Sequence, residues 1–372
     1  MARPVPMDCS TPIDIVYLWV DGTDPRWRQK RRQALAKLGL GQHGAMALYG
    51  NVEGRFRDND ELRYSLRALE RFFPQHGHVY LVTDGQTPAW LGAHARLSVI
   101  DHRELIPAGA LPTFDSGHIE SYIHHIAGLS ERYFYCNDDV FFGAPVNLED
   151  WFWTGGIYVG WSDDAGVSDE ALRKDATALD NACRLSHQWL RASTPTAPHY
   201  QPTFRTFAHA PRPMRKSVLF ELEQRAPELF AAVRSTVFRA WDKPTIVSDF
   251  VLRWSLATGL ARVRDYAHLH VSSGDVQGHG GLEQLMAQLG ELAFFCINDT
   301  TDDAHASDPR LAQVREALQT MFPTPSSFEQ PAPTQAHNLA GAIRHLKGKA
   351  RAARPAGHAG GPTLAGAPAP PA

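Results

Sequence analysis

Short runs of apolar, β-branched and aromatic residues recur along most of the chain, with helical patterns between them. Strands that are buried on both faces read as continuous apolar runs, and alternation with helices is typical of a mostly parallel sheet covered on both faces. The pattern therefore predicts an α/β fold. We expect strands at 13–20, 79–83, 97–100, 133–136, 157–161 and 292–297.

Two helices are predicted between these strands. The first follows the acidic run at 58–61, places apolar residues at helical spacing and ends at Pro74. The second begins near Ser116 and stops at Gly128.

The composition of the chain changes near residue 324. Residues 1–323 are predicted to form one folded domain, within which 162–260 reads as a helical insertion or lid. Residues 324–372 are rich in Pro, Ala and Gly and lack the apolar surface needed to fold, so we predict a disordered tail. Its basic segment, 343–354, is either a short helix that rests on anionic lipid or part of a solvated tail.

Charge and cysteine usage narrow the partners and the compartment. The 372-residue chain carries a formal net charge of -3, so no overall basic field attracts nucleic acid, and we expect no nucleic-acid partner. The four cysteines are scattered without a metal-binding or disulfide spacing, as in a cytoplasmic protein with reduced thiols. No apolar stretch is long enough to span a bilayer, and the start of the chain lacks a secretory pattern.

Polar side chains follow three of the predicted strands. Asp21 and Asp24 come after the first strand, Asp84 after the second, and Asn137-Asp138-Asp139 after the strand at 133–136. In open α/β sheets, ligands bind beyond the carboxyl ends of the strands. These residues are therefore candidates for a binding site.

The adjacent carboxylates of Asp138 and Asp139 suggest a metal ion. Two such charges repel each other by about 4 kcal/mol at a separation of about 4 Å near a protein surface, and a divalent cation relieves that repulsion. Oxygen ligands favour Mg²⁺ or Mn²⁺, which would also bind the phosphates of a donor. A second pair, Asn298-Asp299, follows the strand at 292–297, although each pair also fits an ordinary turn.

Basic residues supply the other half of a phosphoryl-transfer site. Such a reaction needs positive charge on the phosphate oxygens and a group that positions or deprotonates the attacking hydroxyl. Arg239, His209, Arg63 and Arg67 are candidates, each of which also fits a surface position.

At these residues the chain resembles the Stealth family, which includes bacterial capsule-polymer hexose-1-phosphate transferases and the catalytic subunit of animal N-acetylglucosamine-1-phosphotransferase. Four regions carry the resemblance, and the third is the loosest. They are 13–24; 55–67 continuing through 80–90 to 135–140; His209 with Arg239 and Ser248-Asp249; and 296–299.

The resemblance implies a Rossmann-like fold related to the GT-A glycosyltransferases, with 1–323 as the catalytic domain. It also implies that the hydroxyl of a glycan acceptor attacks the sugar-linked phosphate of a UDP-sugar, releasing UMP and forming a phosphodiester in a capsule or other surface polysaccharide. The basic tail would then suit peripheral contact with the inner face of the plasma membrane or with a capsule assembly complex.

Under this interpretation the metal ligands are Asp138, Asp139, Asn298 and Asp299. Arg239 would neutralise the transferring phosphate, with Asp139 also counted among the catalytic groups. His209 would deprotonate or orient the acceptor hydroxyl.

The remaining candidates would bind the donor. Asp21 and Asp24 would hold the nucleotide or order its loop. Asp58 with Arg63 would frame the donor pocket. Asp84 and Asn137 would also contact the substrate.

Two alternatives use the same residues. One is a metal-dependent glycosyltransferase that releases UDP, and the other is a non-catalytic protein that binds a sugar nucleotide or a glycan. The products of the reaction distinguish the first, and an absence of turnover with bound donor distinguishes the second.

Overall fold

The computed structural model describes residues 12–168, 171–193, 201–276, 280–299, 301–305 and 307–331. The chain divides into a compact unit, Met1–Glu329, and a second unit, Gln330–Ala372. The predicted basic segment at 343–354 lies outside the described residues.

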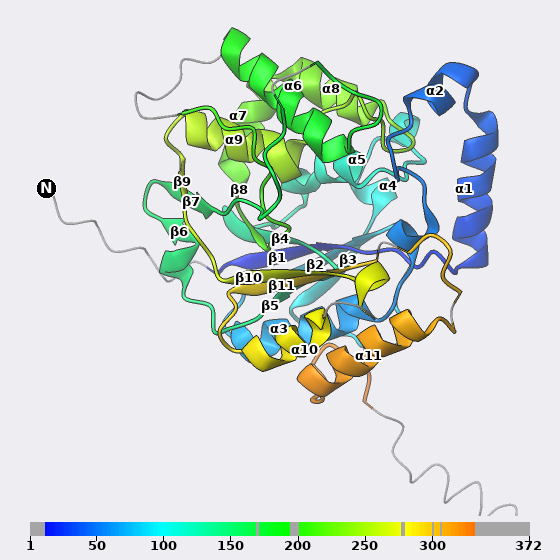
Figure 1. Cartoon of the computed structure of the whole chain (residues 1–372), viewed down its shortest axis with the longest axis vertical. Coiled ribbons are helices and arrows are strands. Elements are labelled where there is room, and N and C mark those ends of the chain that lie inside the picture. The colour runs from blue at the N-terminus through cyan, green and yellow to red at the C-terminus, as the bar shows by residue number, and fades with distance from the viewer. Residues whose placement is uncertain are drawn as a thin grey trace, which may run out of the picture. The chain divides into compact units, whose positions relative to one another are not determined.

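The central sheet has five strands in the order β3-β2-β1-β4-β8 (Figure 1). β1 (Asp14–Leu18) runs parallel to both β2 (Val79–Thr83) and β4 (Arg132–Asn137), and β2 runs parallel to β3 (Leu97–Asp101). β8 (Arg212–Arg215) adds to β4 in the antiparallel direction. The expected mostly parallel sheet is confirmed, and one of its strands comes from the stretch interpreted as a helical insertion.

The strand order reverses beside β1. The chain first builds outward from β1 to β2 and β3, and then returns to place β4 on the other side of β1. Such a switch point leaves a crevice outside the carboxyl ends of the two strands. Leu18 is the register partner of both Val82 and Asn137, so the residues that follow β1, β2 and β4 emerge at one edge.

Aromatic packing fixes β4 within the core. The fully buried ring of Phe134 meets four other rings edge to face, with centroid distances between 5.2 and 6.1 Å. Those rings belong to Phe73, Phe142, Trp151 and Phe152. The strand that presents Asn137 is therefore anchored by contacts on several elements.

Two small sheets flank the central one. In the first, β11 (Phe294–Asn298) lies between β10 (His268–Ser272) and β5 (Val140–Phe142). In the second, β7 (Gly156–Val159) lies between β6 (Phe152–Trp153) and β9 (Ala261–Val263).

The strands expected at 157–161 and 292–297 form, but they belong to these small sheets. β11 lies outside the central sheet because the turn at Asp138-Asp139 sends the chain out of that sheet into β5, and β5 rather than β4 then pairs with β11. β7 pairs instead with β6 and β9.

Helices cover both faces of the central sheet. In Figure 1, α6 to α9 lie on one side, and α3, α10 and α11 lie on the other. The helices are α1 (Pro25–Lys37), α2 (Leu40–Ala45), α3 (Glu61–Phe72), α4 (His102–Leu105), α5 (Ser116–Glu120), α6 (Ala178–Ser193), α7 (Lys216–Arg225), α8 (Pro227–Arg234), α9 (Val251–Ala257), α10 (Gly281–Gln288) and α11 (Pro309–Met321). None of the helices in the described part of the chain is long and apolar enough to cross a membrane.

The first predicted helix forms as α3. The second is interrupted, because α5 ends at Glu120 and only the 3₁₀ turn η3 (Ile123–His125) follows before Gly128, whose φ is 81°.

The compact unit extends six residues beyond the predicted boundary at 323. Phe328 is fully buried, and the carboxylate of Glu329 accepts hydrogen bonds from Arg67 at 2.6 and 2.9 Å and from Arg63 at 2.6 Å. Burial alone would raise the pKa of Glu329, but the hydrogen bonds from Arg67, the Ser326 amide and Arg63 outweigh it and hold the pKa at about 2. This segment is part of the fold.

Replacing Glu329 with Gln should lower the free energy of unfolding by about 3 kcal/mol at pH 7, because the buried guanidinium of Arg67 loses its counter-charge. The folded-state pKa lies below the unfolded one, so the wild-type advantage is complete above about pH 5 and declines as the pH falls toward 2. Urea unfolding at pH 7 and pH 4 measures both effects. Equal stability of the two proteins at pH 7 would contradict this role.

Candidate active site

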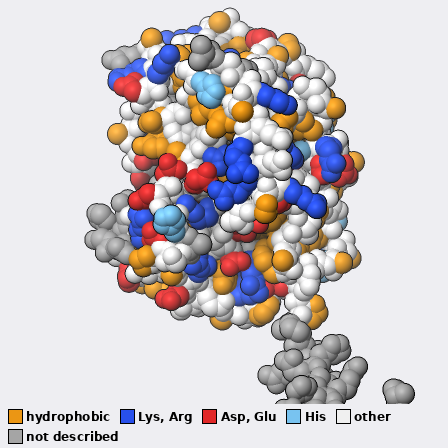
Figure 2. Space-filling model, turned by 90° about the vertical axis from the view of Figure 1, so that its right-hand side faces the viewer, with side chains coloured by type: hydrophobic (Ala, Val, Ile, Leu, Met, Phe, Trp, Pro, Cys, Tyr) orange, Lys and Arg blue, Asp and Glu red, His pale blue; other side chains and the backbone are white. Residues whose placement is uncertain are grey.

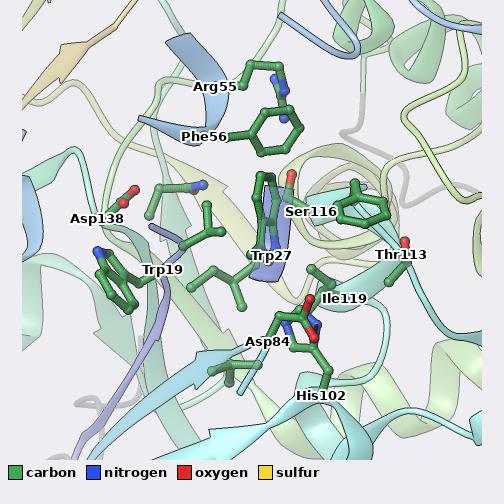
Figure 3. Close-up of a pocket in the computed structure, with 15 residues that line it drawn as sticks. Trp19, Trp27, Arg55, Phe56, Asp84, His102, Thr113, Ser116, Ile119 and Asp138 are labelled. Carbon is green, nitrogen blue, oxygen red and sulfur yellow. Dashed lines mark ion pairs between the residues drawn. The ribbon is translucent and has the colours of Figure 1, made fainter. Parts of the chain in front are cut away.

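An aromatic hollow of about 660 Å³ opens at the carboxyl ends of β1, β2 and β4. Trp27 and Phe56 lie at its centre, with Trp19 to one side and Asp84 beside His102 at its base (Figure 3). The rings of Trp27 and Phe56 are 5.1 Å apart. A hollow that combines aromatic rings with polar groups is suited to a planar organic group such as a nucleobase.

A close backbone contact builds the roof of this aromatic hollow. The amide of Gly22, after β1, donates a 2.7 Å hydrogen bond to the carbonyl of Phe56 in the 3₁₀ turn η1 (Glu53–Phe56). A Cβ atom at Gly22 would lie 2.2 Å from that carbonyl oxygen. Only glycine allows η1 to approach β1 and carry Arg55 and Phe56 over the site.

Asp21 and Asp24 order the loop between β1 and α1. Asp21 Oδ1 accepts hydrogen bonds from the amide and the hydroxyl of Thr23, and Asp24 Oδ1 caps α1 by accepting from the amide of Arg26 at 2.8 Å. Gln86 ties the two together by donating to Asp21 O and Asp24 Oδ2. Both residues therefore order this loop, which is one of the two roles predicted for them. Contact with the nucleotide stays a prediction.

A second hollow, of about 970 Å³, adjoins the first and is strongly polar. The two share Arg55, Ser116, Asn137 and Asp138 in their linings, so Asn137-Asp138 forms the seam between them. The polar hollow gathers carboxylates and cations from distant parts of the chain: Glu61, Glu120, Asp139, Asp299, Arg57, His209, Arg212 and Arg239.

Four carboxylates crowd the seam. Burial raises the pKa of Asp138 far above its usual range, and the charges of Asp139, Glu61 and Asp58 raise it further. Burial followed by Asp60 raises the pKa of Asp58 to about 7, and burial followed by Asp58 raises that of Glu61 to about 8. Like charges withdrawn from water in this way favour either a proton or a bound cation.

Asp139 lies against His209. Its Oδ1 is 3.3 Å from His209 Nε2, and its Oδ2 accepts a weak hydrogen bond from the thiol of Cys296 at 3.4 Å. Burial would raise the pKa of Asp139, but the charge and hydrogen bond of His209 outweigh it and lower the value. The backbone before His209 is fixed by the bridge between Trp161 and Phe207.

The donor atoms fit a hard divalent cation only in part. Asp139 Oδ1 is buried and has no well-aligned hydrogen-bond partner among the described residues, and the carboxylate oxygens of Asp138 and Asp139 are the ligand type that suits Mg²⁺ or Mn²⁺. Donor atoms of Asp139, His209 and Cys296 also lie within 4.8 Å of one another. Burial raises the pKa of Cys296 well above its usual value, which keeps its thiol protonated and makes it a poor ligand.

Asp299 lines the polar hollow, but both of its oxygens are engaged. Oδ2 binds Arg57 in an ion pair, and Oδ1 accepts from Ser273 at 3.0 Å and from the hydroxyl of Thr301 at 2.6 Å. Asn298 lines the same hollow. Through its ion pair with Arg57, Asp299 holds the segment that carries Arg55 in place. Its role as a metal ligand stays a prediction.

Three arginines point their charge at the polar hollow. Arg239 donates to the hydroxyl of Ser116, and its Nε lies 3.6 Å from Asp115 Oδ1. Arg212 at the start of β8 is 5% exposed, and its buried Nε and Nη1 have no hydrogen-bond partner among the residues that the structure describes. In the described part of the chain the buried Nε of Arg55 has no such partner either. Burial, followed by the charge of Arg239, lowers the pKa of Arg55 to about 9.

Sequence reasoning selected Arg239 but did not give Arg55 or Arg212 a role. Arg212 lies in a strand of four residues, and only the pairing of that strand with β4 brings it to the site. No local pattern distinguishes it from Arg215 on the same strand, which pairs with Glu131.

Several predicted donor contacts lie elsewhere. Arg63 pairs with Glu329 and lines neither hollow. Asp58 lies behind η1, where its Oδ1 accepts from the amide of Asp60. Asp84 does line the aromatic hollow. Its Oδ1 binds Lys30 at 2.6 Å, and its buried Oδ2 has no hydrogen-bond partner within the described ranges.

Positive charge borders the aromatic hollow on its outer side. α1 contains six Lys or Arg residues and no acidic residue, and Arg26, Arg28, Arg32 and Lys37 are exposed. Figure 2 shows the side of the molecule on which α1 lies, with Lys and Arg side chains gathered across its middle. Such a surface attracts anions toward a site on the same helix.

Three conserved regions of the Stealth proteins match the sequence. Region 1 matches residues 11–39, region 2 matches 55–159, and region 4 matches 291–340. The chain belongs to the Stealth family. The Asn137-Asp138 seam and Asp139 lie in region 2, and Asp299 lies in region 4. The basic residues of the polar hollow that lie between these two regions are His209, Arg212 and Arg239.

Relatives of this Stealth protein are named exopolysaccharide phosphotransferases. Two from Streptomyces coelicolor are 36% and 38% identical over 89% and 88% of the chain, which spans 34% and 54% of their own lengths. The protein CpsY of Mycobacterium tuberculosis is 32% identical over 89% of the chain, which spans 60% of that protein.

Solved structures with a similar backbone arrangement have low sequence identity to this chain. An active-site mutant of LgtC is 10% identical, with a TM-score of 0.41, and covers 87% of this chain and 98% of its own. The inositol-1-phosphate CTP transferase of T. maritima is 12% identical, with a TM-score of 0.35, and covers 84% and 96%. Scores this low leave the fold assignment to the strand order of the central sheet.

Replacing Asp138 with Asn should raise the free energy of unfolding by roughly 2 kcal/mol at pH 8 in EDTA, because a buried carboxyl with a raised pKa disfavours the folded state. The folded-state pKa lies above the unfolded one, so the gain should shrink as the pH falls toward 4. Thermal unfolding with and without Mg²⁺ tests this, since a bound cation should cancel the gain. An Asn variant no more stable than the wild type in EDTA would refute the crowding of charge.

Proposed function

We propose that this Stealth protein transfers a hexose-1-phosphate or N-acetylhexosamine-1-phosphate from a UDP-sugar to a hydroxyl of a glycan acceptor, in the synthesis of a capsule or other surface polysaccharide. The observation that carries the proposal is the polar hollow, in which Arg55, Arg212 and Arg239 face the crowded carboxylates beside an aromatic hollow. Membership of the Stealth family and the names of the relatives support the reaction class.

The two hollows divide the donor between them. The aromatic hollow, with Trp27 and Phe56, receives the uridine. The seam at Asn137-Asp138 then receives the diphosphate, and the sugar extends into the polar hollow. The basic face of α1 adds long-range attraction for this dianion.

Transfer moves one phosphorus between two oxygens. The acceptor oxygen attacks the phosphorus that carries the sugar, the bond to the bridging oxygen breaks, and UMP leaves with the electron pair of that bond. His209 takes the proton of the acceptor hydroxyl on the ring nitrogen that does not face Asp139, and the carboxylate of Asp139, 3.3 Å from Nε2, stabilises the imidazolium that forms.

Arg239, Arg55 and Arg212 stabilise the negative charge that develops on the phosphate oxygens. These guanidinium groups lie in a partly buried hollow, where each charge acts more strongly than in water. A divalent cation held by Asp138 and Asp139 would neutralise charge on the diphosphate and on the leaving UMP.

The nucleotide product tests the proposal. Incubation with a panel of UDP-sugars, Mg²⁺ or Mn²⁺ and short glycan acceptors should release UMP and form an acid-labile phosphodiester, measured by anion-exchange chromatography and mass spectrometry. Release of UDP with no phosphodiester would instead make the chain a glycosyltransferase. Donor binding without turnover for any acceptor would make it a binding protein.

Two arginines of β8 provide matched variants for the same assay. Arg212→Met should reduce transfer by about 10²- to 10³-fold, the usual cost of removing one preorganised donor to developing charge. Its melting temperature should not fall, because the lost charge is buried and, among the described residues, neither Nε nor Nη1 of Arg212 has a hydrogen-bond partner. Arg215→Met, which removes only the partner of Glu131, should leave transfer unchanged. Equal activity of the two variants would remove Arg212 from the site.

A further inference from the structure

Two adjacent histidines and a glutamate converge at a place that lines neither hollow. His124 and His125 belong to the 3₁₀ turn η3, and Glu223 lies on α7. The Nε2 atoms of His124 and His125 lie 2.8 and 2.9 Å from the same carboxylate oxygen, Oε2 of Glu223. One donor atom from each residue therefore lies within 4.8 Å of the other two.

We propose that His124, His125 and Glu223 form a second metal site, specific for a borderline divalent transition metal such as Zn²⁺. Two imidazole nitrogens and one carboxylate oxygen are a ligand set that zinc uses, whereas Mg²⁺ prefers oxygen ligands alone. The side chain of His125 is 40% exposed and that of Glu223 is 22% exposed, so a water molecule can reach the fourth position. The fully buried ring of His124 closes the inner side.

The surroundings hold the three ligands in place. Arg234 forms an ion pair with Oε1 of Glu223 and leaves Oε2 facing the histidines. Arg234 is itself fixed by a 2.6 Å hydrogen bond to the carbonyl of Ser121. Phe220 packs edge-on against both imidazoles, at 4.8 and 5.0 Å. Ligands oriented by outer contacts of this kind bind metal more tightly than mobile ones.

The position of the site indicates a structural role. η3 follows α5, which carries Ser116 and Glu120, and α7 follows β8, which carries Arg212. A metal bridging η3 to α7 would cross-link the segments that follow two elements lining the polar hollow. We expect it to stabilise the fold without entering the transfer reaction.

Zinc titration of the full chain tests the site. Among the described residues a second group able to hold such a metal includes His209, so the experiment uses an EDTA-treated His209→Ala protein as its background. Calorimetry should detect one bound Zn²⁺ per chain, with a rise in melting temperature, and excess Mg²⁺ should not displace it. Co²⁺ bound in place of Zn²⁺ should give the visible absorption bands of a four-coordinate site.

Two variants and one control decide the assignment. In that background His125→Gln and Glu223→Gln should weaken zinc binding at least about 10-fold, as expected for loss of a ligand. His43→Gln alters an exposed histidine outside the group and should bind zinc unchanged. Circular dichroism in EDTA checks that each variant is folded. Equal zinc affinity for His125→Gln and His43→Gln, or no zinc binding by the unaltered background, would overturn the proposal.

Discussion

Repulsion among buried carboxylates is the constraint on which the site depends. The parallel pairing of β1 with β4 brings Asp138 to the switch point of the sheet, and the start of α3 brings Glu61 and Asp58 toward it. Asp58 raises the pKa of Glu61, and both of these carboxylates raise the pKa of Asp138. An arrangement that costs stability persists where function requires it.

The arginines of the polar hollow do not neutralise these carboxylates. Within the described part of the chain, no ion pair joins Arg55 or Arg212 to a carboxylate, although both lie near the acidic seam. Unsatisfied charges of both signs therefore share one hollow. A ligand that brings a cation to the carboxylates and an anion to the arginines satisfies both, and a metal-bound diphosphate is such a ligand.

Much of the fold could be predicted because local sequence patterns determine it. The buried strands are continuous apolar runs, and α3 has both its acidic start and its proline stop. The separate sheet containing β11 could not be predicted, because it depends on the turn at Asp138-Asp139. The break after α5 likewise has no local signal that we identified.

The sequence predicted which residues line the site better than it predicted the role of each residue. Asn137, Asp138, Asp139, His209 and Arg239 do line one hollow, as expected. The side chain of Asp299 is held by Arg57 and Ser273, which lie far from it in the sequence. Arg63 is held by Glu329, in the segment that the sequence assigned to the tail. Arg212 gained its importance only from the pairing of β8 with β4.

The central claim is that Asp138 and Asp139 hold a cation in contact with the donor phosphates. Electron-nuclear double resonance on Mn²⁺-loaded protein measures this contact directly. With a UDP-sugar bound, the account predicts a strong ³¹P coupling to manganese that disappears in Asp139→Asn. Manganese that binds equally well in the variant, or that shows no ³¹P coupling with donor bound, would contradict it.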